Sequence, residues 1–280
     1  MDKPVIAFII GIILAIGIYL LIRGMLEARS LKITRDTISR TDREGDPDLR
    51  IFYFSDLHAE FCFIHPADLT ALIRREYEQK GLDMVVFGGD TCNNPLKVQK
   101  AVDYLNRIKE VCDSVGIPFL GVSGNHDQLV DEDDLDRCGY KCLDKKCITV
   151  SSRVDGSDIA ITGVPDSGRF DRVWYDPPKI PEGCKGHILF AHNPDQILNL
   201  PEDHDVDIMI SGHIHGGQIR TLLGIEFKLL RKDILPRRGI ISGLHDVEGI
   251  KLFISKGIGC VFLPFRYKAP PEVNIIEIKL

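Results

Sequence analysis

The stretch IFYFSDLH, residues 51–58, decides how the rest of the chain is interpreted. Its mainly apolar residues 51–55 are typical of a buried β-strand, and Asp56 and His58 follow where that strand ends. Open α/β sheets present their functional loops at strand ends. The stretch therefore predicts a sheet with a functional loop at residues 56–58.

Four later segments carry similar side chains: GD at 89–90, GNHD at 124–127, AHN at 191–193 and GHIH at 212–215. Runs that predict strands precede three of them, at residues 84–88, 119–123 and 206–210. Aspartate, asparagine and histidine supply the oxygen and nitrogen ligands that suit manganese, iron or zinc. None of the five segments contains cysteine.

Together the segments supply seven candidate metal ligands: Asp56, His58, Asp90, Asn125, His192, His213 and His215. One ion that keeps an open position rarely needs more than three or four protein ligands, so seven predict two ions that share a bridging carboxylate. Two ions roughly 3.5–4 Å apart can hold a bridging hydroxide and the oxygens of a phosphate for in-line displacement. His126 is predicted to protonate the leaving group, with Asp127 orienting it.

Any one of these segments alone would more often be a turn or a surface histidine than a ligand. The ordered set DxH, GD, GNHD, H and GHxH resembles the calcineurin-like metallophosphoesterases over residues 51–280. Residues 211–219, 256–266 and 270–272 further resemble the membrane-associated YkuE/YaeI-type phosphodiesterase branch, which includes UDP-2,3-diacylglucosamine pyrophosphatases.

The resemblance implies an α/β fold, an αββα four-layer sandwich of two sheets flanked by helices. It also implies a division of the ligands. Asp56, His58 and His215 would hold the first ion, Asn125, His192 and His213 the second, and Asp90 would bridge them. Every one of these positions carries the residue type that the family requires, which argues against a non-catalytic scaffold.

The N-terminal segment predicts a membrane anchor. Residues 5–22 are apolar and uncharged, and a helix of about 18 residues just crosses a hydrocarbon core of ~30 Å. A cleavable signal peptide is the alternative, but the run is long for one, and residues 23–30 lack a clean small-x-small cleavage site before new charges. The expected organisation is an anchor at 1–24, a juxtamembrane linker at 25–48 and the metallophosphoesterase domain at 49–280.

The charges that flank this run predict its orientation. Before the run there are only Lys3 and the α-amino group, set against Asp2, whereas the basic residues that follow are Arg23, Arg29, Lys32, Arg35 and Arg40. Such an excess favours a cytoplasmic catalytic domain. The alternative is an exported cell-envelope phosphatase or phosphodiesterase.

The amino-acid composition limits the classes of partner that are expected. The 280 residues carry a formal net charge of −6, without the basic stripe typical of nucleic-acid-binding surfaces, so no nucleic acid is expected as a partner.

The eight cysteines form no CxxC pair and predict reduced thiols, with a small metal or disulfide cluster of Cys138, Cys142 and Cys147 as the alternative.

Hydrophobic periodicity predicts alternating elements and then a strand-rich C-terminal third. The expected helices are residues 66–80, 95–111, 131–137 and 194–200. The expected strands are residues 49–55, 84–88, 117–122, 148–151, 159–162, 187–191, 206–210, 239–242, 251–255 and 273–278.

Several residues outside the motifs are candidates for substrate contact. Phe61, Phe63 and Ile64 either line an entrance for an acyl chain or pack against the next helix, and residues 262–265 form a second apolar run. Arg220 and Arg266 are candidates to hold a phosphate, because arginine binds phosphate oxygens in a bidentate manner; a surface salt bridge is the alternative for each.

The sequence thus predicts a hydrolase of phosphodiester or pyrophosphate bonds with two divalent ions, manganese before iron or zinc, and a bridging hydroxide. The expected substrate is membrane-associated, with UDP-2,3-diacylglucosamine of lipid A synthesis as the specific candidate, because an anchored site gains effective concentration toward molecules in the same bilayer.

Overall fold

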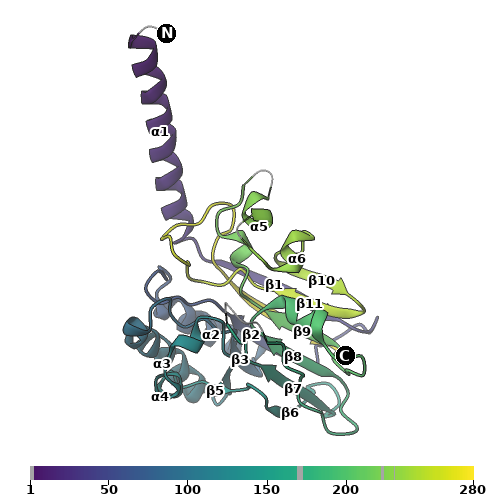
Figure 1. Ribbon diagram of the computed structural model, residues 1–280. Coiled ribbons are helices and arrows are strands. Elements are labelled where there is room, and N and C mark those ends of the chain that lie inside the picture. The colour runs from purple at the N-terminus through teal and green to yellow at the C-terminus, as the bar shows by residue number, and fades with distance from the viewer. Residues whose placement is uncertain (1–2, 169–172, 222–223, 230) are drawn as a thin grey trace.

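The computed structural model describes residues 3–168, 173–221, 224–229 and 231–280, and its strands form two six-stranded sheets (Figure 1). Sheet A has the strand order β1 (Lys32–Ser39), β12 (Glu272–Lys279), β2 (Leu49–Phe54), β3 (Met84–Phe87), β4 (Phe119–Gly121) and β5 (Lys141–Cys142). Sheet B has the order β10 (Gly243–Val247), β11 (Ile250–Ile254), β9 (Ile208–Ser211), β8 (His187–Ala191), β7 (Asp158–Val164) and β6 (Cys147–Ser151).

Helices cover the outer face of each sheet. The helices α2 (Pro66–Lys80), α3 (Val98–Val115) and α4 (Glu132–Arg137) pack on sheet A. The 3₁₀ helix η3 (Pro194–Asn199) and the short helices α5 (Ile225–Leu229) and α6 (Ile234–Arg237) pack on sheet B. The predicted αββα sandwich is confirmed, although its second helical layer is thin.

Strand β2 shows how the sequence creates these layers. Successive side chains of a strand point to opposite faces. Phe52 and Phe54 therefore join the core under α2 and α3, whereas Ile51 and Tyr53 join the core between the sheets. Because both faces are covered, all six residues of the strand are buried, which explains why every one except Arg50 is apolar or aromatic.

The parallel strands bring the motif loops to one edge. Strands β2, β3 and β4 run parallel in sheet A, as do β7, β8 and β9 in sheet B. The five loops that carry the candidate ligands follow the carboxyl ends of β2, β3, β4, β8 and β9. Ligand sites of open α/β sheets lie at such edges.

Most predicted elements are present, with three corrections. The helix predicted at 95–111 begins as the 3₁₀ helix η1 (Pro95–Lys97) and continues as α3 to Val115. The strand predicted at 239–242 is wrong, because α6 ends there with Gly239 in a left-handed conformation, and β10 begins only at Gly243. The two-residue strand β5 was not predicted.

The linker predicted at 25–48 is also partly wrong, since it contains strand β1. All eight residues of β1 pair in parallel with β12, and only Ile38 among them is buried. The strand lies at the edge of sheet A, where the backbone ladder rather than apolar burial holds it, and polar side chains suit such edges. Hydrophobic periodicity therefore could not reveal it.

Helix α1 (Lys3–Glu27) projects away from the sheets (Figure 1) and is long and apolar enough to cross a membrane. Its side chains are exposed until its last turn, where Gly24 is buried against Phe265. The amide of Arg266 donates to the carbonyl of Gly24 at 3.1 Å, and the amide of Ala269 donates to Glu27 Oε1 at 2.8 Å. Residues 1–2 of the predicted anchor lie outside the described residues.

The cysteines agree with the expectation of reduced thiols. All eight are free, so the alternative of a disulfide within the trio is excluded. Cys112 and Cys138 pack in the core between sheet A and its helices, where burial raises the pKa of each thiol to about 12. These two thiols contribute to packing rather than to chemistry.

A buried ion pair joins α2 to sheet A and gives a prediction about stability. Arg50 Nη2 donates to Glu76 Oε2 at 2.6 Å, and both residues are buried. Burial opposes ionisation of Glu76, but hydrogen bonds from Arg50 and Arg35 outweigh it and hold the Glu76 pKa below its ordinary value of 4.5. The contribution of the pair is therefore present above about pH 4.5 and is lost as the pH falls further.

Arg50→Leu is expected to lower the free energy of unfolding by about 3 kcal/mol at pH 7, because it leaves a buried carboxylate with weaker pairing. Urea unfolding of the full chain in detergent measures this. Arg137→Leu, which removes an exposed pair with Asp134, is the control and should cost under ~1 kcal/mol. Equal losses for the two variants would contradict the prediction.

Candidate metal centre

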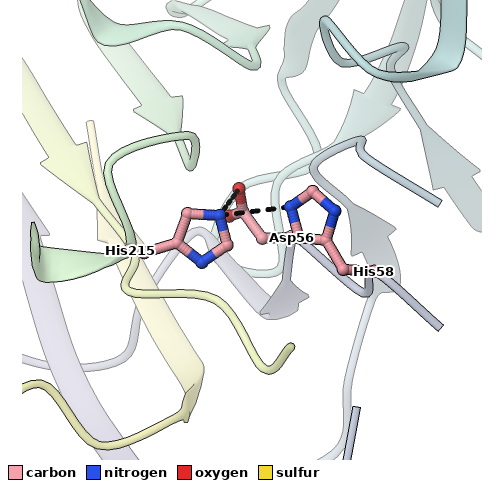
Figure 2. Close-up of side chains that lie close together, drawn as sticks. All are labelled: Asp56, His58 and His215. Carbon is pink, nitrogen blue, oxygen red and sulfur yellow. Dashed lines mark hydrogen bonds and ion pairs between the residues drawn. The ribbon is translucent and has the colours of Figure 1, made fainter. Parts of the chain in front are cut away.

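The loops after β2 and β9 bring together the first group of candidate ligands, Asp56, His58 and His215 (Figure 2). The Nε2 atoms of His58 and His215 lie 3.2 Å apart, and His215 Nε2 lies 3.2 Å from Asp56 Oδ1. All three residues are buried. This is the set that the family resemblance assigns to the first ion.

A second group adjoins it and consists of Asp90, His192 and His213. His192 Nε2 lies 3.2 Å from both Asp90 Oδ2 and His213 Nδ1. The same Oδ2 atom of Asp90 is 3.4 Å from His58 Nε2 in the first group. Asp90 thus lies between the two groups, where a bridging ligand belongs.

The donor atoms fit metal ions. Two ligands of one ion, each at about 2.1 Å, are separated by roughly 3.0–3.4 Å. The spacings above have this size, and two pairs of imidazole nitrogens point at one another, which a shared cation explains. Asn125 Oδ1 is buried and lacks a hydrogen-bond partner in the structure. It is therefore available to a cation, as the resemblance implies for the second ion.

Burial and the carboxylates of Asp56 and Asp90 determine the protonation of the histidines in the two ligand groups. Burial lowers the pKa of His58 to about 3, which leaves its imidazole neutral. Burial also opposes protonation of His192, but Asp90 and Asp56 outweigh it and raise the His192 pKa to about 10. Without a metal, a proton on His192 supplies positive charge between the carboxylates. Metal ligation requires the neutral imidazole, so this proton and an ion exclude one another.

The ligand loops have a strained backbone. Five of the seven candidate ligands have positive φ angles: Asp56 (54°), His58 (38°), Asp90 (64°), His213 (70°) and His215 (55°). Residues other than glycine adopt this region at a cost of about 1–3 kcal/mol each, and such strain clusters at functional sites. The surroundings must therefore hold these residues firmly.

Close packing supplies that support. A Cβ atom on Gly124 would lie 2.2 Å from Asp90 Oδ1, so the glycine of the GNHD segment leaves room for the bridging carboxylate. The amide of His126 donates to the same oxygen at 2.8 Å. These contacts orient Asp90 before any ion binds.

Asp127 joins two of the ligand loops, a role that the sequence did not predict. Its carboxylate accepts hydrogen bonds from the amides of Asp90, Thr91 and Gly124, each at 2.8 Å, and from the hydroxyl of Thr91 at 2.7 Å. These four bonds join the loops after β3 and β4. Asp127 therefore positions Asp90, and its orientation of His126 stays a prediction.

His126 lies beside the centre, as predicted. Its ring is buried and stands edge-on to the ring of His58, with the two ring centroids 4.8 Å apart. It also forms a third group of possible ligands with His58 and Asp90. The position suits either a proton donor or a ligand, and metal content separates the two roles.

The surroundings of Arg266 argue against the predicted contact with a phosphate. Its side chain is 0% exposed, and its guanidinium donates to the carbonyls of Lys256, Gly257, Gly259 and Ala269. One of its nitrogens, Nη2, lies 3.2 Å from His215 Nδ1. Arg266 therefore holds the loop after β11 against a ligand, because its carbonyl contacts leave no group for a phosphate.

The other residues predicted to contact substrate differ in how the structure places them. Arg220 is half-buried, and its role toward phosphate stays a prediction. Ile64 packs in the core under α2 and α3, as the packing alternative expected. Phe63 lies under the guanidinium of Arg29, with 4.2 Å between that group and the ring centroid.

Arg231 and Asp233 form a pair that supports His213 and that the sequence did not reveal. Asp233 Oδ1 lies 3.4 Å from His213 Nε2, and Arg231 donates to Asp233 Oδ2 at 2.9 Å and to the carbonyl of His213 at 3.0 Å. A carboxylate behind a ligating histidine fixes its ring and raises its basicity. No motif marks residues 231–233, so only the fold reveals the pair.

Asp233→Asn is expected to weaken metal binding about 10- to 100-fold without abolishing it, because the ring of His213 loses its charged partner. Metal retained after dialysis against graded concentrations of Mn²⁺ measures the change. Asp246→Asn, an exposed position on β10 that pairs with Lys251, is the matched control. An unchanged metal affinity in Asp233→Asn would remove the proposed support.

The comparisons with known proteins agree with this geometry. The family model for calcineurin-like phosphoesterases matches residues 49–217, which include all seven candidate ligands. The chain belongs to the calcineurin-like phosphoesterase family. This phosphoesterase is therefore a hydrolase with a candidate dinuclear metal site, and the predicted family and enzyme class are confirmed.

Relatives cover nearly the whole phosphoesterase. The uncharacterized metallophosphoesterase YkoQ of Bacillus subtilis is 28% identical over 87% of this chain and 89% of its own. Phosphodiesterase YaeI of Escherichia coli is 25% identical over 84% of each chain. A solved dimetal phosphatase from Danio rerio is 13% identical over 80% of this chain and 94% of its own, with a TM-score of 0.46.

Proposed function

We propose that this phosphoesterase hydrolyses phosphodiester or pyrophosphate bonds in a substrate held in a membrane, with UDP-2,3-diacylglucosamine as the specific candidate. The observation that carries the chemistry is the convergence of two adjoining ligand groups on Asp90. The similarity to the phosphodiesterase YaeI supports the bond type.

The candidate residues have separate roles in the proposed reaction. Asp56, His58 and His215 would hold one ion, with Asn125, His192 and His213 at the other and Asp90 between them. Two divalent ions held there, proposed to be Mn²⁺, would supply a water of lowered pKa and neutralise charge on the phosphate. Asn125 directs its amide toward the phosphate oxygens, and His126 donates a proton to the departing oxygen.

Helix α1 supports the membrane part of the proposal. Its exposed apolar surface has no partner layer within the described residues. Its last turn packs against the domain through Gly24 and Glu27, which favours an anchor that stays attached over a signal peptide that is removed. The basic residues after α1 support a cytoplasmic catalytic domain.

Product analysis tests the proposal. The full chain in detergent micelles with Mn²⁺ should convert UDP-2,3-diacylglucosamine to UMP and the lipid monophosphate, as detected by mass spectrometry. The Asp90→Asn variant should form neither product. Hydrolysis of an aryl phosphodiester without cleavage of the lipid would retain the metal chemistry and reject the lipid substrate.

A further inference from the structure

Two large apolar side chains protrude next to each other near the metal centre. Phe262 is 69% exposed and Leu263 is 47% exposed, within the run Val261–Phe265 that we term the apolar shoulder. Single exposed apolar residues are common on protein surfaces. The position of the shoulder, rather than its exposure alone, indicates what covers it.

The shoulder lies at the foot of α1 (Figure 1), where the yellow end of the chain passes the base of that helix. Phe265 packs on Gly24, and the next residue, Arg266, donates its amide to the Gly24 carbonyl at 3.1 Å. Leu26, two residues after Gly24 in the last turn of α1, is 64% exposed. If α1 crosses a bilayer, its last turn and the shoulder therefore meet the same membrane surface.

Hydrogen bonds within the protein satisfy several backbone groups of the shoulder, as a region poor in water requires. Gln218 accepts from the amide of Val261 at 2.7 Å and donates to the carbonyls of Val261 and Leu263 at 3.0 and 3.1 Å. The amides of Leu263 and Phe265 bond within the shoulder itself. Such internal bonding removes much of the cost of placing irregular backbone near lipid.

Cations and an aromatic ring surround the shoulder. The side chains of Arg23 and Lys268 lie over the ring of Tyr267, at 5.3 and 5.6 Å from its centroid. Arg29 is also exposed close to this end of α1. Basic residues beside aromatic ones are typical of the membrane interface, where they meet anionic headgroups.

The end of the shoulder that packs on α1 also reaches the metal centre. Gln218 stands three residues after His215, and Arg266, directly after the shoulder, reaches His215 Nδ1 at 3.2 Å. A membrane surface that contacts the shoulder therefore lies beside the first group of ligands.

We propose that the apolar shoulder inserts into the boundary between headgroups and acyl chains of the bilayer that α1 crosses. The metal centre then faces phosphate groups of membrane lipids without the lipid leaving the surface. This inference rests on the proposed membrane anchor and deepens it, because it assigns a second contact with the bilayer and a lipid phosphoester as substrate class.

Fluorescence quenching tests the insertion. The full-length Phe262→Trp variant is reconstituted in vesicles of phosphatidylethanolamine and phosphatidylglycerol that contain phosphatidylcholine brominated at a shallow acyl position. The control is Val154→Trp, an exposed apolar position in the β6–β7 turn, at the sheet edge opposite the metal centre. The signal of the native Trp174, measured in the wild type, is subtracted from both.

The introduced tryptophan of the shoulder variant, F262W, is expected to emit at shorter wavelength than that of V154W and to lose most of its emission to bromines about 5–10 Å deep. Equal quenching of the two variants would overturn the proposal. A shift to shorter wavelength without quenching would also overturn it, because a protein partner or a second copy would then cover the shoulder.

Activity provides a second test. The double variant Phe262→Ser/Leu263→Ser should lower the ratio of the rate on a lipid-embedded aryl phosphodiester to the rate on a soluble one by about tenfold or more. An unchanged ratio would contradict a role in reaching lipids. If the wild type cleaves neither ester, the proposed function fails, while the quenching result still decides whether the shoulder inserts.

Discussion

Asp90→Asn is expected to reduce the rate of phosphoester hydrolysis by about 10³-fold or more and to remove bound metal at the same time. The Oδ2 atom of Asp90 is near His58 in one ligand group and His192 in the other, so the substitution weakens both groups. Metal ions contribute several kcal/mol to such reactions, and each 1.36 kcal/mol is a tenfold change in rate.

Metal content and rate on an aryl phosphodiester are measured on the same preparation of the full chain. Asp246→Asn, on the exposed edge strand β10, is the control for the loss of one carboxylate and should retain both properties. An Asp90→Asn protein with full metal content and wild-type turnover would show that Asp90 does not bridge the ions.

His126→Ala should have the opposite combination of effects, with metal retained and turnover lost. A positioned acid contributes about 10²–10⁴ in rate when the leaving group needs a proton. The loss should therefore be largest for an alkyl phosphoester and small for a p-nitrophenyl ester, whose leaving group departs as the anion. The buried position of His126 beside the ring of His58 is the basis of this expectation.

Metal stoichiometry distinguishes the proton donor from the ligand. If His126→Ala loses one ion, the third group of candidate ligands describes the site better, and the assignment as an acid fails. If the metal stays and the alkyl ester is cleaved at the wild-type rate, His126 has neither role. His245→Ala, on edge strand β10, controls for the loss of an imidazole and should change neither quantity.

The fold and the ligand groups could be predicted because their determinants are local. Strand β2 is apolar on both faces and is followed at once by Asp56 and His58, and the same arrangement recurs at β3 and β4. Parallel pairing then brings the loops together without further information. The seven candidate ligands could therefore be assigned to one metal centre from the sequence.

The supporting contacts could not be predicted because they join distant segments through ordinary residues. Arg231 and Asp233 act on His213 from a stretch without a motif, and Arg266 resembles a phosphate-binding residue until its burial is known. Strand β1 carries almost no apolar signal, since pairing with β12 defines it. Such roles follow from the fold alone.

The order of strands in sheet A has a consequence for biosynthesis. Strand β12, residues 272–279, lies between β1 and β2, so β1 has no neighbouring strand in sheet A until residues 272–279 have been synthesised. An edge left open in this way is exposed to mispairing with other chains. Strands β2 to β5 pair with one another and are complete by residue 142, so β1 should join sheet A in one of the last steps of folding, after β12 has been synthesised.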